Sequence, residues 1–230
     1  RQAAGQVKEA LGGEPLAGLV NNAGFSLFGP LMHLSLKEFS EQLSVNVSGL
    51  LGVTQSFVPL LRAGAEAAGR GEQRPGRIVN IGSVSGKTAY PFMGAYAASK
   101  HAVEALSDGL RRELMLYGID VILIEPGVVR TAIVDKVAAQ IDAYAHTDYG
   151  PTIAAMKEQL LDSTRRRALP VQRIAGLIVK VLEHPRPRTR YPVPLGWLVG
   201  WFLPQRLPDR VFDRLVGRRL GLTQRRGGSV

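Results

Sequence analysis

The chain has 230 residues, enough for one sizeable core, and its 45% hydrophobic and 21% charged residues are typical of a globular protein. The absence of cysteine excludes disulfides and thiolate metal sites, and the scattered histidines lack metal-ligand spacing, so we expect no metal. Residues 165–230 hold 15 Lys and Arg against 3 Asp and Glu, a net +12, whereas residues 1–164 hold 14 against 16, a net −2. A basic end of this kind suits anionic lipid, nucleic acid or an acidic partner, or is a solvated tail.

The sequence begins with Arg1 rather than Met, and residues 1–15 have the pattern of a helix closed by Gly12 and Gly13. We therefore expect this sequence to be part of a longer chain. No signal peptide is visible, and we expect no helix long and apolar enough to span a membrane.

Three short apolar runs predict buried parallel strands. The first, 16–20, ends in the turn Asn21-Asn22-Ala23-Gly24; the second is 77–82; the third, 119–125, stops at Pro126-Gly127. Without a further partner, strand 16–20 would be an exposed hydrophobic edge.

Helical patterns separate these runs. One extends from 34 to about 62, opened by Ser35 and Glu38 at the spacing of a capping box, and is followed by an exposed connector at 63–75. A second covers 94–117. The alternation of strand and helix implies parallel pairing with right-handed crossovers and an α/β fold.

The rest of the chain is mostly helical. Residues 128–167 have a helical pattern with a break near 149–151, 171–183 form another helix, and 190–193 suit an edge strand that tolerates its proline. Residues 195–203 hold both tryptophans, and 204–220 are amphipathic and arginine-rich. These last segments either roof an apolar pocket and touch anionic headgroups, or pack as a subunit contact.

The stretch from Ser83 to Lys100 carries the candidate chemistry. Tyr96 and Lys100 are four residues apart in a predicted helix, so their side chains lie on one face. A nearby cation favours the ionised phenol, so we expect Lys100 to lower the pKa of Tyr96 toward the range useful for general acid–base catalysis. Ser83 would hold the substrate oxygen.

Five motifs occur in order along the chain. They are Asn21-Asn22-Ala23-Gly24, Asn46 within Ser44–Val47, Asn80-Ile81-Gly82-Ser83, Tyr96-Ala97-Ala98-Ser99-Lys100 and Pro126–Thr131. Together they resemble the short-chain dehydrogenase/reductase family, of the kind that acts on sterols and retinoids. The resemblance is close over residues 1–135 and looser beyond.

The resemblance implies a role for each matching position. Tyr96 would be the general acid/base, Lys100 would lower its pKa and bind the nicotinamide ribose, Ser83 would orient the reacting oxygen, and Asn46 would hold a water in a proton relay. The cofactor, NADP or NAD, would meet the following residues: Asn22, Ala23, Gly24, Tyr96, Lys100, Pro126, Gly127, Val129 and Thr131.

Each of these positions also has a simpler explanation. Asn46 would cap or cross-link a helix, Asn22–Gly24 would be an ordinary turn, Thr131 would be a helix N-cap, and Ser83 would be a loop hydroxyl bonded to backbone. The sequence also lacks the family's glycine-rich phosphate loop and the residue that separates NAD from NADP.

We therefore expect a three-layer, doubly wound parallel sheet of Rossmann type, present from its fourth strand onward. Residues 1–194 would be the C-terminal part of this one domain, and 195–230 a basic, apolar extension. The expected function is NAD(P)-dependent interconversion of a lipophilic alcohol and its ketone or aldehyde. The alternative is a shortened, cofactor-deficient relative that acts as a membrane- or partner-binding module.

The remaining expectations concern partners and location. The resemblance implies a homo-oligomer formed through the helices that hold Asn46 and Tyr96. We expect no nucleic-acid partner, because the basic end has no recognised motif. We expect a cytoplasmic location, with peripheral membrane contact through 195–226 as an option.

Overall fold

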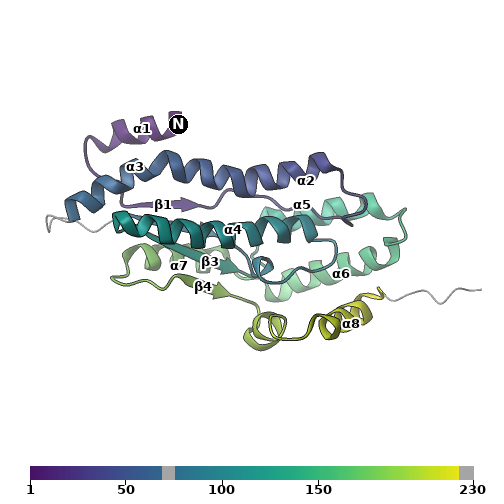
Figure 1. The fold of residues 1–230 in the computed structure, drawn as a ribbon. Coiled ribbons are helices and arrows are strands. Elements are labelled where there is room, and N and C mark those ends of the chain that lie inside the picture. Colours follow the sequence, from purple (N-terminus) through teal and green to yellow (C-terminus); the bar gives the residue numbers. More distant parts are fainter. Residues whose placement is uncertain (69–75, 223–230) are drawn as a thin grey trace, which may run out of the picture.

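The computed structural model describes residues 1–68 and 76–222, which form an α/β fold around a four-stranded parallel sheet (Figure 1). The strands follow one another in space as they do in sequence: β1 (Gly18–Asn21), β2 (Arg77–Ile81), β3 (Asp120–Pro126) and β4 (Arg190–Val193). The helices are α1 (Gln2–Leu11), α2 (Leu36–Leu43), α3 (Leu50–Ala68), α4 (Gly94–Glu113), α5 (Ala132–Ile141), α6 (Gly150–Arg167), α7 (Val171–Glu183) and α8 (Asp209–Leu220).

Helices cover both faces of the sheet, as expected for three layers. Alternate strand residues point to opposite faces, so Ile78 and Val121 pack with Leu61 of α3 on one face. On the other face, Val79 and Ile122 pack with the inner side of α7. Burial on both faces explains why these strands are continuous apolar runs.

The strand and helix positions were mostly confirmed: the bounds of α7 and β4 are as expected, and most others lie within four residues of the expected ones. The expected helix 94–117 ends at Glu113 and continues as a 3₁₀ turn, Leu114–Tyr117, closed by Gly118 in the left-handed region. β1 and β4 are the two ends of the sheet, so Pro192 does lie in an edge strand. The expected connector 63–75 was wrong in its first part, because α3 continues to Ala68; residues 69–75 lie outside the described part.

The long helical stretch after β1 departs from expectation in two ways. A π-helical segment, Ser44–Gly49, interrupts it between α2 and α3. The stretch Leu36–Ala63 also has the length and mean hydropathy (1.2) of a membrane-spanning helix, which the sequence reading had not anticipated.

This stretch is nevertheless built as a layer of the α/β fold, because its polar side chains point inward. Gln42, Asn46 and Thr54 are almost fully buried, whereas Val45 and Val53 are 44% and 42% exposed. Thr54 Oγ1 accepts a hydrogen bond from Asn21 Nδ2 of β1 at 2.9 Å. The sheet side of the helix is thus polar at these positions, and the outer side exposes these valines among polar residues such as Glu41 and Gln55.

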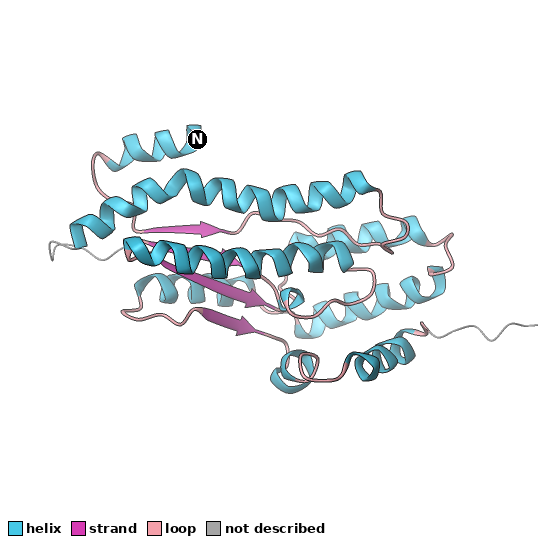
Figure 2. Ribbon diagram, viewed as in Figure 1, coloured by secondary structure: helices cyan, strands magenta, loops and turns pink. Residues whose placement is uncertain are grey.

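Helices α5, α6 and α8 lie toward the carboxyl ends of the strands, which all point the same way (Figure 2). Helix α5 packs on α6, and α6 contacts α8. Phe28 and Phe92, from the loops after β1 and β2, pack into this region with Ile141 and Ile153. The sheet therefore carries an apolar cluster at the edge where ligands bind in open α/β folds.

Candidate active site

The predicted site residues gather at the carboxyl edge of the sheet. Asn22, Ala23 and Gly24 follow β1 directly, Ser83 follows β2 by one residue, and Pro126 ends β3. Helix α4, which carries Tyr96 and Lys100, contacts the 3₁₀ turn Val84–Gly86 that begins at Ser83. The fold therefore brings the chemistry predicted on separate segments to one place.

Lys100 is buried within this edge. Its Nζ donates a hydrogen bond to the Ile81 carbonyl of β2 at 2.7 Å, and it lies 5.7 Å from the centroid of the Tyr96 ring. Among the described residues, no carboxylate forms an ion pair with it. Burial without a counter-charge lowers the pKa of Lys100 from 10.5 to about 8.

Tyr96 forms a side-chain hydrogen bond with Ser83, and its pKa moves in the direction opposite to the one expected. Burial of the phenol raises the pKa of Tyr96 above 10.0, and a side-chain hydrogen bond with Ser83 acts in the opposite sense. Lys100 does not reverse this, because its ammonium points to the Ile81 carbonyl rather than to the phenol oxygen. The expectation that Lys100 sets the direction of the shift was wrong for this arrangement.

The Ser83 hydroxyl also contacts backbone atoms, which agrees with the simpler explanation that it is a loop hydroxyl bonded to backbone. Ser83 Oγ accepts a hydrogen bond from Ser85 N at 3.1 Å and lies 3.5 Å from the Pro126 carbonyl. These contacts fix the hydroxyl at the start of the turn, where it still reaches Tyr96. The two explanations are therefore compatible.

Asn46 links two segments of the site. Its Nδ2 donates to the Phe25 carbonyl and to Ser99 Oγ of α4, both at 3.0 Å, and its Oδ1 accepts from Phe25 N at 3.1 Å. A Cβ at Gly24 would come within 3.1 Å of that Oδ1, so the glycine permits this close approach. The side chain is a cross-link between the loop after β1 and α4, and its position in a π-helical segment is typical of functional sites.

Two glutamines hold the same loop, and the sequence analysis missed both. Gln42 accepts from Leu27 N at 2.8 Å and donates to the Phe25 carbonyl at 2.7 Å. Gln140 of α5 accepts from Phe28 N at 2.8 Å. The only sequence signal was a glutamine on the core-facing side of a helix, because the contacts span up to 114 residues.

Comparison with known proteins decides the family. The family model for short chain dehydrogenases matches residues 1–142, more than half of the chain. The chain belongs to the short-chain dehydrogenase family. The resemblance drawn from the motifs is thereby confirmed.

Two curated relatives of this short-chain dehydrogenase illustrate its range. An NADPH-dependent 3-dehydrocapnine reductase from Ornithobacterium rhinotracheale is 38% identical over 188 residues, which cover 82% of this chain and 64% of the relative. Retinol dehydrogenase 16 from Rattus norvegicus is 34% identical over 205 residues, covering 83% of this chain and 60% of the relative. The chain thus spans about three fifths of the length of these relatives.

Solved structures agree on the fold. An NAD⁺-bound xylitol dehydrogenase has a TM-score of 0.66 and 25% identity, with 84% of this chain and 74% of that chain covered. The complex of Pseudomonas aeruginosa RhlG with NADP has a TM-score of 0.64 and 26% identity, with 85% and 71% covered.

The segments predicted to line the cofactor differ in exposure. Asn22, Ala23 and Gly24 are exposed in an irregular loop, whereas Pro126 is buried. After β3, Val129 forms a parallel bridge with Leu169, which leaves it part-buried. Thr131 does occupy the N-cap position of α5, but its side chain makes no capping hydrogen bond.

Phe92 introduces backbone strain just before α4. It is the one residue other than glycine with a positive φ, 66°, among those described, and such a conformation costs about 1–3 kcal/mol. Gly29 N donates to its carbonyl at 2.8 Å, and its ring packs against Phe28 and Tyr149 with centroids 5.9 and 5.5 Å away. An apolar wall is thereby fixed one helical turn from Tyr96.

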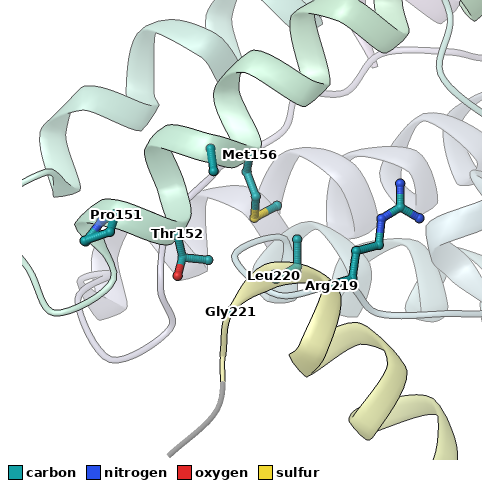
Figure 3. Close-up of a pocket in the computed structure, with 7 residues that line it drawn as sticks. Pro151, Thr152, Met156, Arg219, Leu220 and Gly221 are labelled. Carbon is teal, nitrogen blue, oxygen red and sulfur yellow. The ribbon is translucent and has the colours of Figure 1, made fainter. Parts of the chain in front are cut away.

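A pocket of 380 Å³ lies between α6 and α8 (Figure 3). None of the predicted site residues lines it; its walls come from Pro151, Thr152, Ala155, Met156, Arg219, Leu220 and Gly221. Met156 belongs to both the pocket and the apolar cluster that includes Phe92. The pocket therefore adjoins the apolar side of the site without reaching its polar residues.

The C-terminal segment is attached at one side and exposed at the other. Phe212 of α8 packs edge-on against Tyr90, with ring centroids 6.0 Å apart. Trp197, Leu198 and Phe202 are 60%, 62% and 49% exposed. These apolar side chains are available for the contacts that the sequence analysis considered, with a substrate, a membrane or a second subunit.

Proposed function

We propose that this chain is the catalytic part of an NAD(P)-dependent oxidoreductase that interconverts a lipophilic primary or secondary alcohol and its aldehyde or ketone. The observation that carries the proposal is the meeting of three groups: the part-buried phenol of Tyr96, hydrogen-bonded to Ser83, lies beside a buried Lys100 that has no carboxylate partner among the described residues. A structural lysine is rarely buried without such a partner.

The residues at the carboxyl edge suit the nicotinamide end of the cofactor. Asn22–Gly24 expose irregular backbone there, and within the described chain Lys100 Nζ makes one hydrogen bond and so retains N–H groups for a ribose. NAD(P) would supply the hydride chemistry. We propose Tyr96, Pro126, Gly127, Val129 and Thr131 as the other contacts.

The chain's own residues would move the proton. In the oxidation direction, Ser83 holds the alcohol oxygen and Tyr96, in its ionised form, takes the hydroxyl proton as the hydride leaves carbon; reduction reverses both transfers. Lys100, whose pKa of about 8 keeps it mostly protonated at neutral pH, would stabilise the ionised phenol once its ammonium turns from the Ile81 carbonyl toward the phenol oxygen. Asn46, which is already tied to α4 through Ser99, would hold a relay water.

A lipophilic substrate is favoured by the apolar wall of Phe28, Phe92 and Tyr149 beside α4. The relatives named for retinol and for 17-beta-hydroxysteroids act on compounds of this class by name. The direct experiment incubates the chain with NADH or NADPH, or their oxidised forms, and a panel of retinoid, steroid and short polar substrates, following absorbance at 340 nm. Turnover of the polar members alone would refute the substrate class, and cofactor binding without any turnover would refute the proposed activity.

Peripheral membrane contact is a second candidate role, favoured by the exposed Trp197, Leu198 and Phe202 beside the arginines of α8. We expect the chain to sediment with vesicles of phosphatidylcholine and phosphatidylserine and to be released as salt rises, because screening weakens the attraction of exposed arginines to headgroups. Replacement of Trp197 and Phe202 by serine should reduce binding at least about tenfold, since large apolar side chains anchor such surfaces. Serine at Met115 and Leu116, which are even more exposed, is the matched control; equal loss in both variants would contradict a specific surface.

Self-association through the outer face of α2 and α3 is proposed because that face exposes Val45 and Val53 beside small residues. We expect light scattering to give a mass above 24.9 kDa. Val53→Glu should return the chain to that mass, since an unpaired charge is costly in an apolar contact. A monomeric unmodified chain, or a variant of unchanged mass, would contradict this interface.

A further inference from the structure

A second group of ionisable side chains lies next to the candidate site. Glu104 stands one helical turn after Lys100 on α4 and is 6% exposed, and Glu125, the residue before Pro126 in β3, is fully buried. Neither residue has a part in the proposed chemistry. Two buried carboxyl groups this close to a reaction centre require an explanation.

Glu104 connects α4 to the turn after Ser83 and to β4. Its Oε2 lies 2.6 Å from Nζ of Lys87, which ends the turn after Ser83. The same oxygen accepts from Nε and Nη2 of Arg190 in β4 at 3.2 and 3.0 Å. Arg190 also reaches Asp108 on the next turn of α4 at 3.0 Å, and Asp108 pairs with Arg111.

The other oxygens of the two glutamates lack donors. Within residues 1–68 and 76–222, no N–H or O–H group donates to Glu104 Oε1 or to either carboxyl oxygen of Glu125. Burial and the adjacent Glu104 raise the pKa of Glu125 to about 8, while Lys87 and Arg190 act in the opposite sense. A proton on Glu125 makes it a donor to Glu104, so the pair at neutral pH carries one negative charge.

The pair is joined to the reaction centre through the turn Val84–Gly86. A Cβ at Gly86 would lie 3.0 Å from the Lys100 carbonyl and 3.1 Å from Cγ of Glu104, so the turn lies directly on α4 at these two residues. Ser83 begins the turn and Lys87 ends it. The ion pair between Lys87 and Glu104 therefore fixes one end of a three-residue turn whose other end presents the hydroxyl to Tyr96.

We propose that Glu104 and Glu125 are a positioning pair: Glu104 holds the Ser83 turn against α4 through Lys87, and a proton shared with Glu125 holds Glu104 in place. The expected effect of this pair on turnover rests on the proposed oxidoreductase function. When the shared proton is lost, two adjacent negative charges repel each other, the carboxylate of Glu104 shifts from Lys87, and Ser83 loses its alignment with Tyr96. Neither glutamate touches the substrate.

The first test uses the full chain and needs no activity. The ¹³Cζ resonance of Tyr96, identified by its absence in Tyr96→Phe, reports the hydrogen bond with Ser83. In Lys87→Met and Glu104→Gln we expect this resonance at neutral pH to move toward its position in Ser83→Ala, whereas Lys180→Met, an exposed cation on α7, should leave it in place. A Tyr96 resonance that stays unchanged in Lys87→Met and Glu104→Gln overturns the proposal, whether or not the chain turns over a substrate.

The second test is the pH dependence. A glutamate ¹³Cδ signal that is absent in Glu125→Gln should titrate near pH 8; a midpoint below about 5 overturns the shared proton.

In an active chain, Lys87→Met should lower kcat at least about tenfold with less than a threefold change in the KM for cofactor. Glu125→Gln, whose amide donates at every pH, should raise the ratio of kcat at pH 9 to kcat at pH 6.5 several-fold. Equal ratios in Glu125→Gln and the unmodified chain would also overturn the proposal.

Discussion

Replacement of Tyr96 by Phe is expected to reduce turnover by about 10²- to 10⁴-fold, the usual contribution of a positioned general acid or base. The phenylalanine ring fills the same volume at the start of α4, so the fold should persist. The variant loses the proton donor that Ser83 contacts, and the nearby Tyr149 packs through its ring against Phe92. The measurement is the initial rate at saturating cofactor, together with far-UV circular dichroism and Tm.

Tyr117→Phe is the matched control. This tyrosine lies in the 3₁₀ turn after α4, where its ring stacks under Arg62 at 4.2 Å, and the same atom is removed far from the site. Turnover in Tyr96→Phe within a factor of three of the control would refute Tyr96 as the acid/base. A Tm lowered equally in both variants would leave the kinetic comparison intact.

The sequence predicted the parts of this fold that depend on local pattern. The strands 77–82 and 119–125 are continuous apolar runs because both their faces are buried, and such runs can be found without a structure. Ser83, Tyr96 and Lys100 could be placed together because strand ends and helix periodicity locate side chains within a few residues. The helix 171–183 and the edge strand 190–193 were found at their observed bounds.

The sequence could not predict features that arise from contacts between distant residues. Gln42 and Gln140 hold one loop from opposite sides, and nothing in either segment indicates the other. The direction of the Tyr96 pKa shift depends on where the Lys100 ammonium points, which is set by the Ile81 carbonyl and not by the four-residue spacing. Glu125 reads as the polar end of a strand, and its partner is 21 residues earlier, on α4.

Lys100→Met is expected to stabilise the chain at pH 7 while it removes activity. Burial lowers the pKa of Lys100 from 10.5 to about 8, so keeping the buried ammonium charged costs roughly 3 kcal/mol at about 1.36 kcal/mol per pKa unit. Methionine avoids this cost and fills a similar volume, but it leaves the Ile81 carbonyl without its donor, which costs about 1 kcal/mol. The net gain of about 2 kcal/mol corresponds to a rise in Tm of roughly 4–8 °C for a domain of this size.

The pKa shift of Lys100 determines whether the stability of the chain rises or falls with pH. The folded pKa of Lys100 lies below the unfolded one, so between about pH 8 and 10.5 the unfolded chain binds more protons and stability rises with pH. That rise should be missing in Lys100→Met. Glu125 acts in a different window: its pKa is raised from 4.5 to about 8, so its contribution to stability is lost as pH rises through that range.

Urea unfolding at pH 7, 8, 9 and 10 measures the difference directly, with Lys180→Met as the control for loss of a charge at an exposed position. We expect the advantage of Lys100→Met to be largest at pH 7 and to shrink as pH approaches 10. A variant that is less stable than the unmodified chain at pH 7 would mean that Lys100 is a structural residue. Higher stability without turnover would mean that the chain retains a destabilising cation because the reaction requires it.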